Sequence, residues 1–281
     1  MNGIANSGPA GAATIITVTS GKGGVGKTNV ATSLAIRLAQ AGKRAVLLDM
    51  DLGLANAHVL LGLRPQHSLA DVLTGRKEIE DVMLSGPGNI RFVPGGTGDE
   101  ELANLPQAAL QRLIKSLRRL CASADYLVID TAAGLSRNTM ALARAADAVT
   151  VVTTPEPTAL LDAYAMFKSL KAGSQPDLYL LVNMARTPQE GSQAVRRLDT
   201  VIRSFWQSSL DNAHCVPFDD AVGAAVRART PVLLSQPNSP AAASLRVFAD
   251  AVAARHVATN DAAAKEQSLL GRLLESLKFG T

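Results

Sequence analysis

Cysteine, aromatic side chains and long apolar runs are all scarce in this 281-residue sequence. There are 2 cysteines, and aromatic residues make up 4% of the chain. Because Cys121 and Cys215 lie far apart and form no Cys-x-x-Cys pair, the sequence excludes a disulfide framework and argues against a zinc or iron–sulfur site. We expect two reduced core thiols.

No segment approaches the roughly 18–20 apolar residues that a membrane-spanning helix needs. Residues 1–14 lack the charged and apolar regions of a secretory signal. The predicted location is therefore the cytoplasm. With 47% hydrophobic residues the chain is not disordered. Its net charge of +4 indicates a nucleic-acid partner only if the basic residues cluster on one surface.

Short apolar or β-branched runs alternate with segments of helical spacing. This alternation predicts an α/β fold, a mainly parallel doubly wound sheet with helices on both faces. Three parts are expected: a flexible start (1–13), one domain (14–257), and a tether with a terminal helix (258–281). The expected strands are 14–19, 45–48, 90–93, 126–129, 148–152 and 178–182, and the expected helices are 30–41, 106–120, 137–145, 158–171 and 192–205.

A glycine-rich segment follows the first expected strand and runs directly into a helical pattern. Residues 20–28, SGKGGVGKT, match the phosphate-binding pattern GxxxxGK[ST]. Backbone N–H groups of such a loop surround the β-phosphate, Lys27 bridges the β- and γ-phosphates, and the Thr28 hydroxyl binds Mg²⁺. The predicted nucleotide-binding residues of this loop are Gly21, Gly23, Gly24, Val25, Gly26, Lys27, Thr28 and Asn29.

Three aspartates follow expected strands. Asp49 and Asp51 end the second strand, and because alternate residues of an extended chain point the same way, both carboxylates can face one site. Asp130 ends the strand at 126–129 and precedes a run of small residues. Paired acids at this edge suit Mg²⁺ and its water shell, although Asp49 and Asp51 can instead serve as helix caps.

The strand at 178–182 ends in Asn183-Met184-Ala185-Arg186, which lacks the acid that would pair with guanine. An Asn amide both donates and accepts, and so matches adenine N6 and N7. ATP is therefore preferred over GTP. Asn183 can alternatively cap a helix.

The loop GKGGVGKT resembles the deviant Walker A motif of the MinD/ParA class of P-loop ATPases. The resemblance implies that Lys22 reaches the ATP of a partner in a face-to-face homodimer, although an exposed lysine there can also be simply solvated. It places Asp49 near the metal, Asp51 as the residue that orients the attacking water and Asp130 as a Walker B acid. It also places Val216, Pro217, Phe218 and Asp219 against adenine. The predicted catalytic residues are Lys22, Lys27 and Asp51, and the predicted metal ligands are Thr28, Asp49 and Asp130.

Within the class, the stretches at 51–63, 130–134, 156–168, 183–191 and 216–230 are similar to the flagellar-number regulators of the FlhG/FleN (YlxH) type. Met50 departs from the small residue expected between the two acids, and its side chain is expected to point away from them. The resemblance implies an ATP- and Mg²⁺-dependent homodimer that acts with an FlhF-type SRP GTPase, flagellar switch proteins or a flagellar transcription activator.

The C-terminal segment has helical amphipathic spacing. Its leucines cover an arc of about 140° on a helical wheel, so the helix can lie on the inner face of the cytoplasmic membrane, in a partner's groove, or on its own domain. One copy binds a membrane weakly, and two copies in a dimer bind by effective concentration. The predicted membrane-binding residues are Leu269, Leu270, Leu273, Leu274 and Leu277.

Three alternatives stay open at the sequence level. One is a MinD-type division-site regulator. Another is a ParA-type DNA-partition ATPase, although DNA is an unexpected partner because solvated helix faces also explain the arginines. The third is an adaptor that binds ATP without turnover. The candidate DNA-binding residues are Arg196, Arg197, Arg203, Arg227 and Arg229.

Overall fold

In a computed structural model, the chain forms an eight-stranded sheet with the strand order β3-β4-β2-β5-β1-β6-β7-β8. The structure describes residues 13–51, 56–96, 106–170, 176–206, 210 and 212–256. All neighbouring strands pair in parallel except β3, which runs antiparallel to β4 at one edge. The predicted mainly parallel α/β fold is confirmed.

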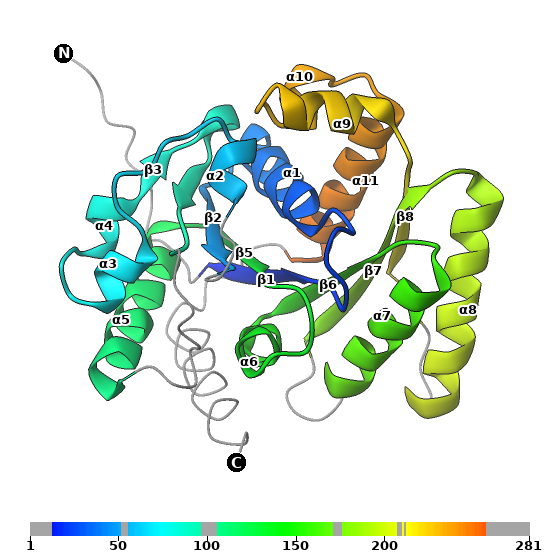
Figure 1. Cartoon of the computed structure of the whole chain (residues 1–281), viewed down its shortest axis with the longest axis horizontal. Helices are drawn as coiled ribbons and strands as arrows, with labels where there is room; N and C mark the ends of the chain where they lie inside the picture. Colours follow the sequence, from blue (N-terminus) through cyan, green and yellow to red (C-terminus); the bar gives the residue numbers. More distant parts are fainter. Residues whose placement is uncertain are drawn as a thin grey trace.

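The helices and strands alternate along most of the chain (Figure 1). The strands are β1 (Thr14–Thr19), β2 (Ala45–Met50), β3 (Leu84–Ser85), β4 (Arg91–Val93), β5 (Tyr126–Thr131), β6 (Ala148–Thr153), β7 (Asp177–Ala185) and β8 (Ala213–Pro217). The helices are α1 (Lys27–Gln40), α2 (Ala57–Leu60), α3 (Leu69–Leu73), α4 (Ile79–Val82), η1 (Pro87–Asn89), α5 (Gln107–Ser123), α6 (Arg137–Ala145), α7 (Pro157–Leu170), α8 (Pro188–Trp206), α9 (Asp220–Arg227), α10 (Val232–Ser235) and α11 (Pro240–Arg255).

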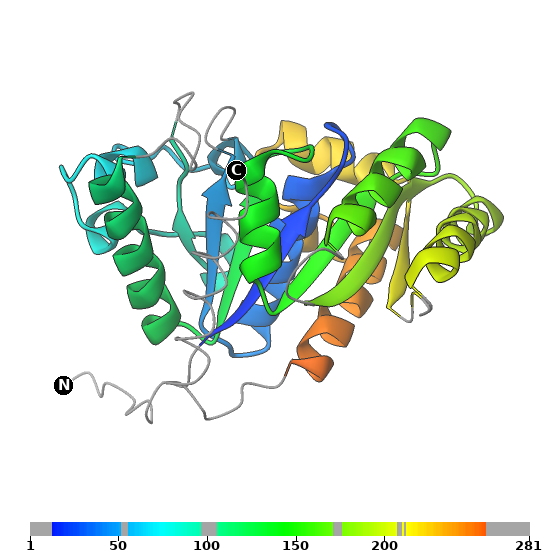
Figure 2. The ribbon, with the colours of Figure 1, turned by 90° about the horizontal axis from the view of Figure 1, so that it is seen from below.

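Two apolar cores sandwich the sheet, since successive strand residues point to opposite faces. Helices α1, α9, α10 and α11 pack on one face (Figure 1), and α5, α6, α7 and α8 lie along the other (Figure 2). In β2, Leu48 and Met50 join the core under α5 to α8, whereas Leu47 joins the core under α1 and α11. Met50 therefore points to the opposite face from Asp49, as expected.

All the expected strands are present, several of them longer by one to three residues at the carboxyl end. The long helices α1 and α5 to α8 are also where the sequence predicts them. Because β1, β2, β5, β7 and β8 run in parallel, their carboxyl ends meet at one edge, where ligands bind in open α/β sheets. Among the described residues, no helix is both long enough and apolar enough to span a membrane.

Candidate functional site

A cleft of about 1040 Å³ opens at the carboxyl edge of the sheet, and we refer to it as the main cleft. Its walls come from the glycine-rich loop after β1, the start of the loop after β2, the loop after β5, the end of β7 and the segment from β8 into α9. The residues that line it include Gly23, Gly24, Gly26, Lys27, Thr28, Asn29, Asp51, Asn183, Pro217 and Asp219.

The glycine-rich loop delivers an uncapped helix N-terminus to the main cleft. Gly24 and Gly26 have φ values of 79° and 87°, a left-handed backbone that favours glycine. Gly26 is the N-cap of α1, and no side chain caps this helix. The first N–H groups of α1 therefore lack side-chain partners and, with the helix dipole, form a site for an anion.

Asn183 fixes the loop from the side. Its Nδ2 atom donates to the Val25 carbonyl oxygen at 2.8 Å, and a Cβ on Gly26 would lie 2.4 Å from the same nitrogen. The predicted helix-cap alternative does not apply, because Asn183 lies within β7 and α8 begins at Pro188. The Nδ2 atom of Asn183 is therefore hydrogen-bonded to the glycine-rich loop.

Two residues of the predicted set support the loop from behind. A Cβ at Gly21 would come within 2.5 Å of the Asp162 carbonyl oxygen, so the loop packs directly on α7. The Val25 side chain is buried in the core beneath α1. Neither residue is among those that line the main cleft.

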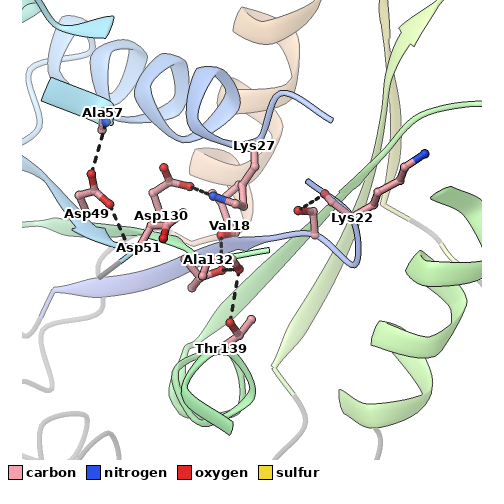
Figure 3. A network of polar contacts seen from close by, with 11 residues as sticks. Val18, Lys22, Lys27, Asp49, Asp51, Ala57, Asp130, Ala132 and Thr139 are labelled. Atoms are coloured by element: carbon pink, nitrogen blue, oxygen red, sulfur yellow. Dashed lines mark hydrogen bonds and ion pairs between the residues drawn. The ribbon is translucent and has the colours of Figure 1, made fainter. Parts of the chain in front are cut away.

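Lys27, which lines the main cleft, forms a buried ion pair with Asp130. The Lys27 Nζ atom lies 2.7 Å from Asp130 Oδ1, and both side chains are less than one tenth exposed (Figure 3). Burial raises the pKa of the Asp130 carboxyl, while the charge of Lys27 and hydrogen bonds from Lys27 and Thr28 oppose this rise. In this state the lysine that binds phosphates in P-loops is held by an acid.

Asp49 lies beside Asp130, because the two residues are register partners in β2 and β5. Its carboxylate accepts the N–H of Asp51 at 3.1 Å and that of Ala57, the first residue of α2, at 3.3 Å (Figure 3). Burial and the adjacent Asp130 raise the pKa of Asp49 to about 7. Asp49 lies within β2 and is not the N-cap of a helix, because the N-cap of α2 is Asn56. Its carboxylate nevertheless accepts the first N–H of α2 and adds a second carboxylate beside Asp130.

These oxygen donors suit a hard divalent cation. Two adjacent buried carboxylates raise each other's cost of ionisation, and a bound cation removes that cost. Thr28 supplies a hydroxyl next to Asp130. Within the described part of the chain no group of three or more His, Cys, Asp or Glu side chains forms a metal site.

Lys22 points away from Lys27 (Figure 3). Its ammonium group lies 2.9 Å from Glu156 Oε2 and 3.2 Å from Thr158 Oγ1, at the start of α7. The pair is exposed at the rim of the site. The loop thus carries two lysines with separate partners, one inside the main cleft and one on the surface.

The segment after β8 forms an apolar wall. Pro217, Phe218 and Val222 line the main cleft, whereas Val216 is buried in the core. Asp219 accepts the N–H groups of Ala221 and Ala241 at 2.9 and 3.0 Å, so its carboxylate joins the N-termini of α9 and α11. Phe218, which the resemblance also places against adenine, is exposed and forms part of this wall.

The loop after β5 is tied to the glycine-rich loop. Gly134, at φ 94°, donates its N–H to the Ser20 carbonyl oxygen at 2.8 Å. The Thr131 hydroxyl donates to the Val18 carbonyl oxygen at 3.2 Å. The two loops are therefore joined by a contact that no local sequence pattern predicts.

Comparison with known proteins decides the family. A family model described as an AAA domain matches residues 13–176, and the FleN antiactivator of Pseudomonas aeruginosa is 41% identical over 239 residues, 85% of each chain. The chain belongs to the MinD/ParA class of P-loop ATPases. The flagellum site-determining protein YlxH of Helicobacter pylori is 35% identical over 190 residues, 67% of this ATPase and 64% of YlxH.

Solved MinD structures share the fold of this ATPase. The cell division ATPase MinD of Pyrococcus furiosus is 26% identical with a TM-score of 0.70, over 86% of this chain and 99% of that one. MinD of Pyrococcus horikoshii, solved with Mg-ADP, is 25% identical with the same TM-score, over 85% and 96% of the two chains. The predicted membrane-binding leucines lie outside the residues that the structure describes.

Proposed function

We propose that this protein is an ATP-driven switch that regulates the number and placement of flagella by binding and hydrolysing ATP. The similarity to FleN and YlxH supports the biological role. The observation that carries the chemistry is the uncapped N-terminus of α1 beside Lys27, Asp49, Asp51 and Asp130.

In this proposal Lys27 exchanges its ion pair with Asp130 for contacts with the phosphates of ATP. The N–H groups of residues 23–28 hold the β-phosphate, and Lys27 leaves Asp130 to bind the β- and γ-phosphates. Asp130 and Thr28 would then hold Mg²⁺, with Asp49 beside them. When bound, Mg²⁺ supplies the charge that stabilises the phosphates during transfer.

Asp51 is proposed to orient the water that attacks the γ-phosphate. It lines the main cleft directly after β2 and connects to Asp49 through its own N–H. A carboxylate there can accept a proton from water and fix its direction. Replacing Asp51 with Ala is expected to preserve ATP-induced dimers and to lower hydrolysis.

Lys22 is proposed to act on the nucleotide of a second copy of the chain. In the isolated chain Glu156 and Thr158 hold it at the rim, pointing away from the main cleft. On dimerisation across this face, Lys22 would leave Glu156 and contact the phosphates of the nucleotide bound to the second copy. Since an added cation stabilises the charge of the transferring phosphoryl group, turnover would then depend on the dimer.

The dimer is further proposed to present a surface to its partners and to the membrane. An FlhF-type GTPase, flagellar switch proteins and a flagellar transcription activator are the proposed partners. Residues 267–278 are proposed to lie on the inner face of the cytoplasmic membrane, with two weak helices acting together.

Counting flagella tests the biological role. Deleting the gene is expected to change the number of flagella per cell in electron micrographs, and wild-type protein but not the Lys27→Ala variant is expected to restore it. Minicells with a normal flagellar number would favour division-site regulation, for which the similarity to MinD gives weaker support. Absence of phosphate release from the purified protein with Mg²⁺ and ATP would leave only an adaptor.

A further inference from the structure

A second cavity of about 520 Å³ adjoins the main cleft on the far side of α2. We propose that this second cavity binds a small phosphate-bearing anion. Its walls are α2, the loop between α2 and α3, the residues that follow β4, and Arg229 after α9. Val59 of α2 borders both the main cleft and the second cavity, so this short helix separates them.

The lining of the second cavity is basic. His58, Arg64, His67 and Arg229 line it, against one carboxylate, Asp71. That carboxylate is already engaged, because it accepts the Ser68 N–H at 2.9 Å and pairs with Arg76 at 2.9 Å.

Two exposed arginines, Arg64 and Arg229, supply the charge of the second cavity that no described protein group pairs. In the part of the chain that the structure describes, neither Arg64 nor Arg229 has a side-chain hydrogen bond or ion pair. Two guanidinium groups at one cavity match the oxygens of a phosphate, which they bind through paired N–H groups.

Arg229 occupies a backbone position that favours glycine. It follows the end of α9 with φ 51°, the left-handed conformation that glycine adopts most readily after a helix. Its carbonyl oxygen lies where a Cβ on Gly62 would approach within 2.9 Å, so the loops that carry Arg229 and Arg64 touch. The fold thereby holds an arginine at the mouth of the second cavity although glycine would suit the backbone better.

The shape favours a small ligand over a polymer. The volume lies within the range of small-molecule sites, about 300–1,000 Å³, and the residues after β4, Pro94 and Gly95, form a buried wall. Extended nucleic acid instead needs basic residues spread along a surface. A small phosphate-bearing anion and a nucleic acid both present phosphate oxygens. The size of the second cavity favours the small anion.

An anion bound in the second cavity would affect nucleotide binding in the main cleft. The first N–H of α2 is held by Asp49, next to the Asp130 carboxylate. An anion that fixes α2 from one side therefore changes nucleotide binding on the other, and the coupling is reciprocal. This regulation goes beyond the proposed flagellar role and does not depend on it.

The test is a titration of the full-length protein, saturated with Mg²⁺ and ADP, with inorganic phosphate. Amide ¹H–¹⁵N signals of Gly62 and Gly95 are expected to shift and saturate, while the Gly24 signal separates any binding at the glycine-rich loop. Combining Arg64→Ala with Arg229→Gly, which suits the left-handed backbone, is expected to weaken phosphate binding at least tenfold. The control pair Arg196→Ala and Arg197→Ala, on exposed α8 positions, is expected to leave it unchanged.

A second readout addresses the coupling. Phosphate is expected to change the ADP dissociation rate at least twofold in wild type and in the control pair, but not in the Arg64/Arg229 variant. Shifts at Gly62 and Gly95 that fail to saturate, or that persist unchanged in that variant, would overturn the proposal. Saturation by duplex DNA but not by phosphate would also overturn it.

Discussion

The Lys27–Asp130 pair dominates the electrostatics of the main cleft at the scale of single residues. It buries two charges at 2.7 Å beside a second carboxylate, Asp49. The attraction between two buried charges offsets the cost of removing them from water only while both partners are present. In this structure Lys27, the proposed phosphate-binding lysine, is therefore paired with Asp130, the proposed metal ligand.

Removing Lys27 is expected to destabilise the nucleotide-free protein. Lys27→Ala leaves Asp130 buried without its cation and is predicted to lower the free energy of unfolding by about 3 kcal/mol. The double change Lys27→Ala with Asp130→Asn should recover much of this loss, because no unpaired charge remains. Urea unfolding without nucleotide measures both, and a loss below about 0.5 kcal/mol in the single variant contradicts the pairing.

Glu156→Gln is expected to favour the dimer by releasing Lys22. The pair is exposed, so its contribution to folding is about 0–1 kcal/mol, and the unfolding free energy should hardly change. Light scattering at limiting ATP is predicted to show a several-fold larger dimer fraction. Glu80→Gln, an exposed acid paired with Arg119 on α5, serves as control. Equal dimer fractions in the two variants would mean that Glu156 does not restrain Lys22.

The sequence predicts individual residues well where the chemistry is local. The spacing of the glycine-rich loop places Gly24, Gly26 and Lys27, and strand parity places Asp49 opposite Met50. The partner of Lys22 is not predicted by a local pattern. Glu156 lies 134 positions away and meets Lys22 only because β1 and β6 are paired neighbours in the sheet. The Lys27–Asp130 and Asn183–Val25 contacts are long-range in the same way.

At the scale of elements, the strands are the most predictable part. The parallel sheet is buried on both faces, so its strands appear as continuous apolar runs. Helix α11 is not predicted, because alanines such as Ala241, Ala242 and Ala249 fill its buried face and give little contrast with its exposed side. The short helices α2, α3 and α4 have too few turns for a periodic signal.

Asp219 joins two helices and gives a pH-dependent contribution. Hydrogen bonds from Ala241 and Ala221, with burial opposing, hold the pKa of Asp219 below its ordinary value. A lowered pKa means that its stabilisation is complete above the unfolded value, about 3.9, and is lost as pH falls through the folded value. Asp219→Ala is therefore predicted to cost about 1 kcal/mol at pH 7 and much less at pH 3.

Urea unfolding of wild type and of the Asp219→Ala variant at the two pH values measures this difference. Ser244→Ala, at a half-buried position of α11, is the matched control and should show no pH-dependent gap. A gap between wild type and Asp219→Ala that is the same at pH 3 as at pH 7 would show that the carboxylate charge is not responsible.

At the scale of the whole molecule, the proposed function depends on a surface that two chains would share. The main cleft lies at one edge of the sheet, with Lys22 and Glu156 exposed at its rim. Leu135 and Leu161 are exposed large apolar side chains of the loop after β5 and of α7. A second copy is proposed to cover this face when ATP is bound.

Deleting residues 267–281 separates membrane contact from catalysis. The truncated protein is predicted to lose ATP-dependent pelleting with liposomes and to keep nearly all of its hydrolysis, because the residues of the main cleft are unchanged. A full-length variant with Leu270 and Leu274 replaced by Ser should behave in the same way. Undiminished pelleting of both variants refutes the membrane role of the segment.

Mixing two inactive variants tests the switch most directly. In a shared dimer, a Lys22→Ala subunit keeps its own Asp51 and receives Lys22 from an Asp51→Ala partner, which completes one site. Each variant alone is predicted to hydrolyse little ATP, and an equal mixture to recover about a quarter of wild-type phosphate release, since half of the dimers are mixed and each contains one complete site. A mixture no more active than its components would contradict the account, because Lys22 would then act within its own chain or not at all.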